Sequence, residues 1–219
     1  LAAMSHELRT PLNSIIGFSR VILKGIDGPL TEMQEQDLTT IHESGKHLLG
    51  LVNDILDQAK IEAGKMELSL GYFKLQDVVR GVMSSAVGLT RDKPIQLYTE
   101  IADDLPDAYG DEFRTRQVLL NLVSNASKFT PQGSITVSAF PIQENGQQFI
   151  QVSVADTGIG IAAKDMGLLF QAFQQVDNSL TRSAEGTGMG LPLARSFTEL
   201  QGGRIWVVSE PDVGSTFSI

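Results

Sequence analysis

The sequence contains no cysteine, one tryptophan and three histidines among its 219 residues. Without cysteine, the chain has no disulfide, no thiolate metal site and no cysteine nucleophile. Basic residues are also scarce, because 17 Lys and Arg face 26 Asp and Glu, which gives a net charge of −9. Domains that hold nucleic acid or anionic membranes are usually basic. We therefore expect no nucleic acid among the partners of this chain.

Long hydrophobic runs are missing as well. No apolar stretch approaches the ~18 residues that a membrane-spanning helix needs, and we expect no signal peptide in this stretch. We expect no membrane contact within this stretch. The chain starts at Leu1 inside a helix-like pattern and ends at Ile219 inside an alternating pattern. We interpret it as a fragment of a longer protein.

The composition is that of a globular protein, with 42% hydrophobic and 20% charged residues. At roughly 150 residues per domain, the length predicts one or two domains. Two helices are expected first, over residues 2–24 and from Thr31 to about Gly64. Thr31 and Gln34 have the spacing of a capping box, and Gly64 suits a helix end. Apolar residues recur along both helices at alternating spacings of three and four.

Two helices alone cannot bury both apolar stripes well. The sequence therefore favours association of two hairpins into a dimeric four-helix bundle. The alternative is that the hairpin packs on the rest of its own chain.

From about residue 67, helical and strand patterns mix, as in an α/β domain. We predict helices at residues 76–91, from Asp111 as N-cap to about Lys128, at 162–173 and at 191–200. Strands are predicted at 95–101, 135–139 and 150–154, with a closing hairpin from 204 to 219. Glu144-Asn145-Gly146 is a hairpin turn signal. The polar, glycine-rich residues 174–190 are predicted to form a mobile loop.

His6 is the first candidate for chemistry. It is rotated about 200° from Leu8 on a helix, so it should point away from the apolar stripe. Glu7 follows directly, Thr10 lies one turn further, and Pro11 should bend the helix. An exposed histidine beside a carboxylate fits a nucleophile with its base, although a plain surface histidine is the alternative. His42 and His47 are interpreted as structural.

Asn121, Asn125 and Lys128 lie on one face of the predicted helix. Carboxamide oxygens can ligate Mg²⁺ beside phosphate oxygens and water, and Lys128 could meet a phosphate. The alternative is a polar face in water.

Two glycine-containing segments follow. Asp156-Thr157-Gly158-Ile159-Gly160 comes directly after a strand, where a carboxylate could accept a hydrogen bond from an exocyclic amine. Gly186-Thr187-Gly188-Met189-Gly190 opens a helix, whose N–H groups can bind an anion. Neither is a Walker loop or a convincing dinucleotide fingerprint.

Five segments, in order, resemble the motifs of sensor histidine kinases. Met4-Ser5-His6-Glu7-Leu8-Arg9-Thr10-Pro11-Leu12-Asn13 resembles the H box, and Asn121-Leu-Val-Ser-Asn125-Ala-Ser-Lys128-Phe-Thr130 the N box. Asp156 to Ile161 resembles the G1 box, Leu169 to Phe173 the F box, and Gly186 to Leu191 the G2 box. Glu185 and Pro192 depart from common family choices, but neither removes a catalytic group.

The resemblance implies two domains. Residues 1–66 would form a dimerisation and histidine phosphotransfer domain, a helical hairpin that pairs into a dimeric four-helix bundle. Residues 67–219 would form a catalytic ATP-binding domain, an α/β sandwich of the gyrase, chaperone and histidine kinase type. The fold class is therefore α plus α/β.

The family also implies roles for individual residues. His6 would accept the phosphoryl group, Glu7 would be the general base, and Thr10 would orient water in dephosphorylation of the partner. Asn125 and Asn121 would hold Mg²⁺, and Phe173 would support the lid. The residues expected to bind ATP are Asn121, Asn125, Lys128, Asp156, Gly158, Gly160, Ile161, Phe170, Arg182, Gly186, Thr187, Gly188, Gly190 and Leu191.

The expected activity is ATP-dependent autophosphorylation of His6, followed by transfer to an aspartate of a response regulator, with possible phosphatase activity. ATP and Mg²⁺ are the expected ligands, a second copy and a receiver domain the expected partners, and the cytoplasm the expected location. A pseudokinase that binds nucleotide only as a scaffold, or an ATPase or serine kinase of the same superfamily, are the alternatives. The sequence leaves open whether transfer occurs within a subunit or across the dimer.

Overall fold

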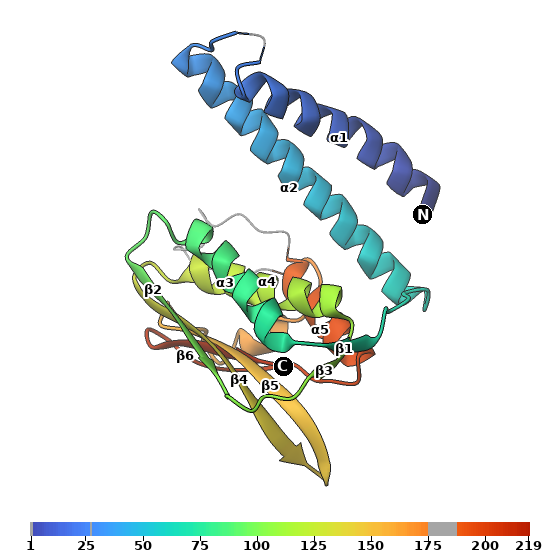
Figure 1. Ribbon diagram of the computed structural model, residues 1–219, viewed down its shortest axis with the longest axis vertical. Helices are drawn as coiled ribbons and strands as arrows, with labels where there is room; N and C mark the ends of the chain where they lie inside the picture. The colour runs from blue at the N-terminus through green and yellow to red at the C-terminus, as the bar shows by residue number, and fades with distance from the viewer. Residues whose placement is uncertain (1, 27, 175–187) are drawn as a thin grey trace. The chain divides into compact units, whose positions relative to one another are not determined.

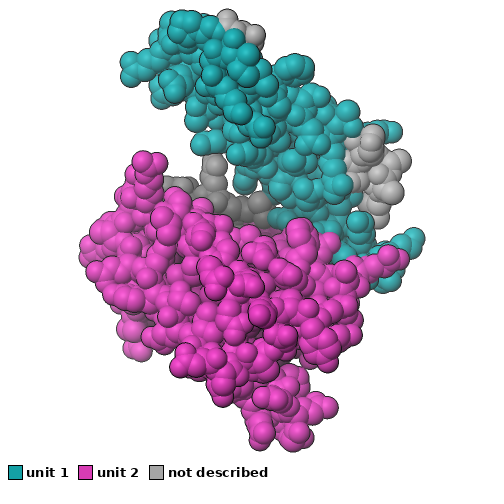
Figure 2. Space-filling model, viewed as in Figure 1, with its two compact units in different colours: residues 1–66 teal, residues 67–219 magenta. Residues whose placement is uncertain are grey.

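The computed structural model describes residues 2–26, 28–174 and 188–219, with side chains from residue 7 onward (Figure 1). The chain divides into two compact units, residues 1–66 and 67–219, which Figure 2 colours teal and magenta. Each unit is described by itself below.

The first unit is a hairpin of two helices, α1 (Ala2–Leu23) and α2 (Glu32–Glu62). The capping box at the start of α2 is confirmed. The Thr31 N–H donates to Gln34 Oε1 at 2.9 Å, and the Gln34 N–H donates to Thr31 Oγ1 at 3.3 Å. Gly64 follows α2 with a φ of +64°, the left-handed conformation that glycine adopts most readily at a helix end. Helix α1 continues through Pro11.

Small and polar residues bring α1 and α2 together. Gly45 lies so close to Ile16 that a Cβ there would be 3.0 Å from Ile16 Cγ1. His42 Nδ1 lies 3.0 Å from Ser19 Oγ and 3.2 Å from the Ile16 carbonyl oxygen, so His42 links the two helices. Further along, Arg9 donates to Asn53 Oδ1 at 2.9 Å. Later residues of α1 therefore pair with earlier residues of α2, from Arg9 with Asn53 to Ser19 with His42, as an antiparallel hairpin requires.

The second unit is a five-stranded sheet with three helices on one face (Figure 1). The strand order is β2 (Ile95–Ile101), β4 (Gly133–Glu144), β5 (Gln147–Asp156), β7 (Gly214–Ser218) and β6 (Trp206–Glu210). β2 runs parallel to β4, and the other neighbours are antiparallel. The helices are α3 (Leu75–Leu89), α4 (Glu112–Phe129) and α5 (Gly190–Leu200). A small sheet pairs β1 (Gly71–Phe73) with β3 (Ala108–Gly110).

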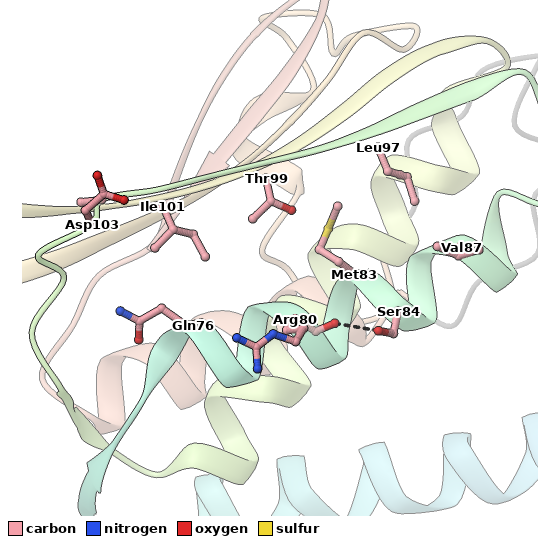
Figure 3. Close-up of a pocket in the computed structure, with 10 residues that line it drawn as sticks. Gln76, Arg80, Met83, Ser84, Val87, Leu97, Thr99, Ile101 and Asp103 are labelled. Atoms are coloured by element: carbon pink, nitrogen blue, oxygen red, sulfur yellow. Dashed lines mark hydrogen bonds between the residues drawn. The ribbon is translucent and has the colours of Figure 1, made fainter.

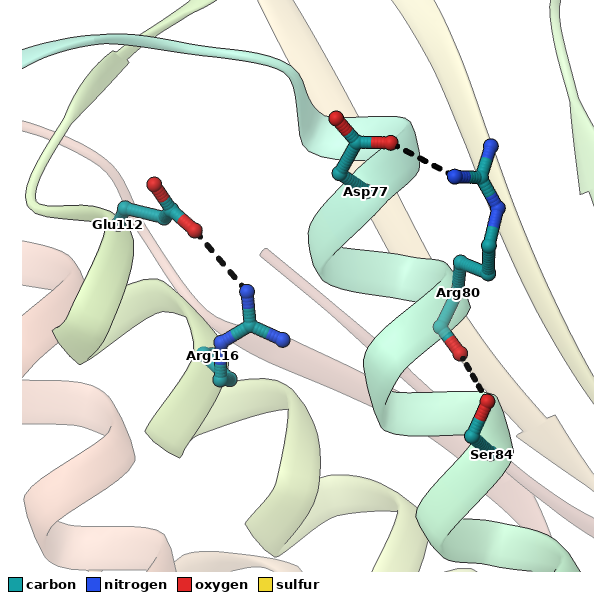
Figure 4. A network of polar contacts seen from close by, with 5 residues as sticks. All are labelled: Asp77, Arg80, Ser84, Glu112 and Arg116. Carbon is teal, nitrogen blue, oxygen red and sulfur yellow. Dashed lines mark hydrogen bonds and ion pairs between the residues drawn. The ribbon is translucent and has the colours of Figure 1, made fainter.

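The core of this unit lies between the helices and the sheet. Apolar side chains that are at most 2% exposed come from both layers, and include Val78, Val79, Val82, Leu119, Leu122, Val123, Ile135, Val137, Val154 and Phe197. On the α3 surface, Gly81 leaves room for Arg116 of α4, whose Nη1 would lie 2.4 Å from a Cβ there. Arg116 also pairs with Glu112 at 2.9 Å, as Arg80 does with Asp77 (Figure 4). These pairs lie at the surface, where an ion pair adds little stability.

Most of the predicted elements of this unit are confirmed. Asp111 caps α4 by accepting a hydrogen bond from the Arg114 N–H at 3.0 Å. Asn145 and Gly146 both have positive φ, of 49° and 80°, as a two-residue hairpin turn requires. The closing hairpin is β6 and β7. The sequence patterns missed β1 and β3, because three residues are too few to show alternation.

The helix predicted at residues 162–173 is wrong. The segment contains only a 3₁₀ turn at Met166–Leu168. Asp165 precedes the turn in a helical conformation and offers no side-chain cap, and Gly167 lies in its middle, where glycine disfavours a helix. Phe173 then takes a φ of +62°, which ends any helical path. No helix in the described ranges is long and apolar enough to cross a membrane.

Candidate functional site

Three segments that are far apart in the sequence meet at one end of the second unit. They are the C-terminal half of α4, the turn after β5, and the start of α5. A Cβ on Gly190 of α5 would lie 2.3 Å from Asn121 Oδ1 of α4, so Gly190 is what allows this approach. The Phe129 carbonyl at the end of α4 accepts a hydrogen bond from the Ile159 N–H at 3.2 Å. The segments that carry the N, G1 and G2 motifs are therefore neighbours.

Asp156 lies at the end of β5, where the strand leads into the turn. Its Oδ1 accepts a hydrogen bond from the Gly158 N–H at 2.8 Å. Burial raises the pKa of the Asp156 carboxyl above its ordinary value. The Gly158 and Ser215 N–H groups and the Thr130 hydroxyl oppose that shift, because they stabilise the charged form. The site thus holds a half-buried carboxyl with several donors around it.

The two glycines of the turn are needed by the protein itself. A Cβ on Gly158 would lie 2.4 Å from the Phe129 carbonyl oxygen. Gly160 has a φ of +64°, and a Cβ there would lie 2.0 Å from the Glu210 carbonyl oxygen. The backbone of Ile161 is fixed next, because its N–H donates to Ser209 Oγ at 2.8 Å. The turn is held against α4 on one side and against the β6–β7 hairpin on the other.

Helix α4 presents the polar face that its sequence predicts. Leu119, Leu122, Val123 and Ala126 are buried on the opposite face. Asn121, Asn125 and Lys128 are each half-buried. Asn121 Nδ2 is fully buried and has no hydrogen-bond partner. A buried donor without an acceptor is costly, so this amide suits a ligand that brings oxygen atoms.

The oxygen atoms of this face are compatible with a Mg²⁺ ion that takes most of its ligands from water and phosphate. Within the described residues, no group of three or more His, Asp or Glu side chains could hold a metal ion. Mg²⁺ often keeps several waters and takes only one or two protein oxygens beside substrate phosphates. The carboxamide oxygens of Asn121 and Asn125 could supply such a minority share of the ligands.

Helix α5 begins without a side-chain cap. The Met189 side chain at the N-cap position makes no capping hydrogen bond, and the first turn carries no acidic residue. Gly188 takes a φ of +68°, and its carbonyl accepts a hydrogen bond from the Phe173 N–H at 3.2 Å. The first N–H groups of a helix lack helical partners and favour anions. Gly190 and Leu191 lie in this first turn and are half-buried.

The aromatic residues of the F motif differ in their surroundings. Phe170 is half-buried, and the Arg195 guanidinium carbon lies 5.9 Å from its ring centroid. Phe173 is 67% exposed. Arg182, Gly186 and Thr187, as well as most of the predicted mobile loop, lie outside the described residues.

The remaining predicted residues belong to the first unit. Glu7 and Thr10 are exposed on α1. His6 lies in the same helix, and its side chain is outside the described part of the structure. Sequence reasoning gave no role to Thr130, although it closes the motif that contains Asn121. Only the fold brings its hydroxyl to Asp156.

A hollow lies elsewhere on this unit, between α3 and the edge strand β2 (Figure 3). It has a volume of about 630 Å³ and is lined by residues such as Arg80, Met83, Leu97 and Asp103. None of the site residues that were predicted from the sequence is among its lining residues.

Two family models match the chain. Residues 1–64 match the His Kinase A (phospho-acceptor) domain. Residues 110–219 match the histidine kinase-, DNA gyrase B- and HSP90-like ATPase family, which covers half of the chain.

Individual relatives agree with these families. The chain is 44% identical to the circadian input-output histidine kinase CikA of Synechococcus elongatus, over 100% of this chain and 29% of the relative. It is 43% identical to the signal transduction histidine-protein kinase BarA of Escherichia coli, over 99% of this chain and 24% of the relative. The chain thus spans less than a third of the length of these relatives.

Solved structures share the fold. Full-length ShkA in complex with AMPPNP matches with a TM-score of 0.81 and 35% identity, over 99% of this chain and 44% of that one. The Acinetobacter baumannii histidine kinase AdeS matches in fold with a TM-score of 0.66 and 24% identity, over 98% of this chain and 96% of that one. The helical hairpin, the α/β domain that follows it and both family matches lead to one conclusion: the chain belongs to the sensor histidine kinases, and it carries their catalytic core.

Proposed function

We propose that this chain is an ATP-dependent histidine autokinase that passes its phosphoryl group to an aspartate of a response regulator. The observation that carries the proposal is that two segments pack on the same stretch of α4: the uncapped start of α5 lies against Asn121, and the turn after Asp156 lies against Phe129. Base recognition and phosphate binding need different chemistry, and these neighbouring segments offer both. The similarity to ShkA, which was solved with AMPPNP, supports ATP as the nucleotide.

Asp156 accepts a hydrogen bond from the adenine amine in this proposal. Gly158, Gly160, Ile161, Phe170 and Leu191 shape the space for the base. The phosphates lie at the N–H groups that begin α5, beside Gly188 and Gly190, and near Lys128. Following the family resemblance, Arg182, Gly186 and Thr187 complete the phosphate side.

Asn121 and Asn125 would hold Mg²⁺ through their carboxamide oxygens. The ion would supply positive charge that offsets the negative charge of the phosphates. The unpartnered Asn121 Nδ2 is free to donate to a phosphate oxygen.

The transfer step uses the first unit. A ring nitrogen of His6 attacks the γ-phosphorus, the new N–P bond forms, and the bond from that phosphorus to the β-phosphate oxygen breaks, so that ADP leaves. Glu7 takes the imidazole proton. An aspartate oxygen of the regulator then accepts the phosphoryl group and His6 is released. Thr10 orients water in the phosphatase reaction of the same proposal.

A homodimer is part of the proposal. Both helices of the hairpin expose large hydrophobic side chains, each at 45–71%: Leu8, Ile15, Phe18, Ile41, Leu48 and Ile55. A second hairpin would bury them in a four-helix bundle. We name these six residues the hairpin stripe.

The test is incubation of the chain with γ-labelled ATP and Mg²⁺. We expect label that is stable in alkali, is lost in acid and is absent from His6→Gln. His47→Gln is the matched control, because His47 is an exposed histidine of α2, and it should label normally. Acid-stable label, or label that persists in His6→Gln, would contradict the phosphohistidine. Nucleotide binding without any labelling would favour the scaffold alternative.

A further inference from the structure

Lys93 lies just before β2, and its side chain reaches the end of α4. Its ammonium donates to the Ser127 carbonyl at 2.6 Å and lies 3.4 Å from the Lys128 carbonyl and 3.5 Å from the Thr130 carbonyl. These three carbonyls belong to the last turn and cap of α4. Lys93 lies outside the five sequence motifs, whereas all three carbonyls belong to the segment that resembles the N box.

The contact has a clear physical reason. The last carbonyls of a helix have no helical N–H partner, and they form the negative end of the helix dipole. A lysine from another segment satisfies the carbonyls and the dipole together. Two further hydrogen bonds hold the same segments in place. Ser127 Oγ donates to the Leu89 carbonyl at 3.0 Å, and the Gly133 N–H donates to the Pro94 carbonyl at 3.0 Å.

The end of α4 is also one wall of the proposed base site. The Phe129 carbonyl receives the Ile159 N–H, and it would lie 2.4 Å from any Cβ on Gly158. The next residue, Thr130, has a buried hydroxyl near Asp156 that lowers the pKa of this carboxyl, although no hydrogen bond of standard length and angle joins the two groups. A displacement of residues 127–130 would therefore move both the turn and the group that faces Asp156.

We propose that Lys93 is a positioning residue for the adenine half of the nucleotide site, acting through residues 127–130. The inference rests on the proposed function only in assigning adenine to Asp156. Lys93 touches neither the base nor the reacting atoms. It fixes the helix end against which the turn of Asp156 and Gly158 is packed.

Another role for a lysine near an ATP site is direct contact with a phosphate. Here the ammonium of Lys93 is directed to three backbone carbonyls. The two roles predict different effects on binding. Loss of a positioning residue weakens binding of ligands that contain the base, whereas loss of a phosphate ligand weakens binding of any polyphosphate.

The experiment measures binding to the full chain by calorimetry, with ADP and inorganic tripolyphosphate as probes. We expect Lys93→Met to weaken ADP binding by about tenfold, the scale of a lost charge-assisted hydrogen bond. Tripolyphosphate, which has no base, should bind with unchanged affinity. Lys93→Arg keeps a cation at the helix end and should recover most of the ADP affinity. Lys74→Met is the matched control, because Lys74 is exposed at the start of α3, and it should leave both affinities unchanged.

A double-mutant cycle tests the route. Thr130→Val removes the hydroxyl that Lys93 helps to place, so Lys93→Met should weaken ADP binding less in the Thr130→Val background. Additive effects would contradict action through Thr130.

Two results would overturn the proposal. An equal loss of ADP and tripolyphosphate affinity would make Lys93 a phosphate ligand. A lower Tm with unchanged ADP affinity in Lys93→Met and Lys93→Arg would make it purely structural. Both are distinct from failure of the autokinase proposal, in which the unaltered chain binds ADP and yet forms no phosphohistidine.

Discussion

The two units of this chain treat their hydrophobic residues in opposite ways. In the second unit, α3, α4 and the central strands share a core of fully buried side chains such as Val79, Leu119 and Ile135, although Phe113 and Phe140 remain exposed. In the described part of the hairpin, Leu12 and Leu56 are the buried large hydrophobic residues, each 7% exposed, whereas Phe18 remains 71% exposed. The second unit can complete its core from its own residues. The hairpin has an apolar surface that its own two helices do not cover.

The units differ in the same way in how they treat a buried carboxyl. Burial raises the pKa of both Asp156 and Asp54. Around Asp156, two N–H groups and a hydroxyl offset the cost of the charge. At Asp54 on α2, burial is the main cause of the raised pKa, and the neighbouring negative charge of Asp57 raises it further. The donors around Asp156 partly offset the effect of its burial, whereas at Asp54 the second cause, Asp57, adds to the effect of burial.

The largest expected effect comes from altering the proposed nucleotide site of the second unit, which tests whether the two units act independently. Asp156→Asn replaces a carboxylate with an amide that offers an N–H donor towards the adenine amine. We expect ATP affinity to fall roughly a hundredfold, because a site built to accept a hydrogen bond loses its acceptor. Equilibrium binding of ATP measures the loss.

The association of the hairpins should not respond to this change. Sedimentation of Asp156→Asn should give the same oligomeric state as the unaltered chain. A change in oligomeric state would show that the two units are not independent in the way their cores suggest.

The reverse experiment alters the hairpin stripe. Ile41→Glu with Leu48→Glu places a charge at each of two apolar positions, and both side chains are 47% exposed in the single chain. Each apolar side chain is worth roughly 1.5–3 kcal/mol when fully buried, so we expect the dimer dissociation constant to rise by about a hundredfold. Concentration-dependent sedimentation measures it.

Gln36→Glu is the control for that pair, because Gln36 is an exposed polar residue of the same helix. It adds a charge without removing an apolar surface, and association should persist. ADP affinity should stay unchanged in both variants. A dimer that survives Ile41→Glu with Leu48→Glu would contradict the hairpin stripe as the interface.

The sequence predicted those parts of the fold that depend on local pattern. The capping box of Thr31, the N-cap of Asp111 and the Asn145-Gly146 turn were each readable from two to four residues. The polar face of α4 was readable from its periodicity. The motif order identified Asp156 and Asn121 as site candidates before their neighbours were known.

The sequence did not predict what depends on packing between distant segments. Residues 162–173 have helical spacing, but the loop is fixed by hydrogen bonds at its ends, from Ile161 to Ser209 and from Phe173 to Gly188. Thr130 and Lys93 carry no motif signal for the contacts they make. Their positions follow from the parallel pairing of β2 with β4, which brings residues 93–94 beside residues 130–133.

The affinity for ADP should depend on pH through the carboxyl of Asp156. Its pKa is raised by burial, so protonation begins at a higher pH than for a free aspartate. A protonated carboxyl is a poorer acceptor for the adenine amine. ADP affinity should therefore be constant at high pH and fall several-fold as the pH drops through the raised pKa. Protonation of the phosphates affects ADP and tripolyphosphate alike, so its effect cancels in the ratio of the two affinities. A ratio that does not change with pH would contradict the role of Asp156.

The smallest expected effect is on the stability of the hairpin. The pKa of Asp54 is raised to about 6 from 3.8, first by burial and then by Asp57. A carboxyl whose pKa is higher in the folded state stabilises the fold while it is protonated. That stabilisation is complete below about pH 3.8 and is lost as the pH rises through about 6. Asp54→Asn cannot ionise, so it should gain free energy of unfolding relative to the unaltered chain between pH 4.5 and pH 7.5.

A shift of about two pKa units corresponds to roughly 3 kcal/mol at full value, but Asp54 is only half-buried, and solvent screening reduces the expected gain to about 1 kcal/mol. Urea unfolding of the full chain at both pH values measures it. Asp37→Asn, at an exposed aspartate of the same helix, should follow the pH profile of the unaltered chain. If Asp54→Asn follows that profile too, then the acid on α2 is as well compensated as Asp156, and the contrast between the two carboxyls would disappear. If the gain appears, the hairpin bears an uncompensated charge near neutral pH that the second unit avoids by surrounding its acid with donors.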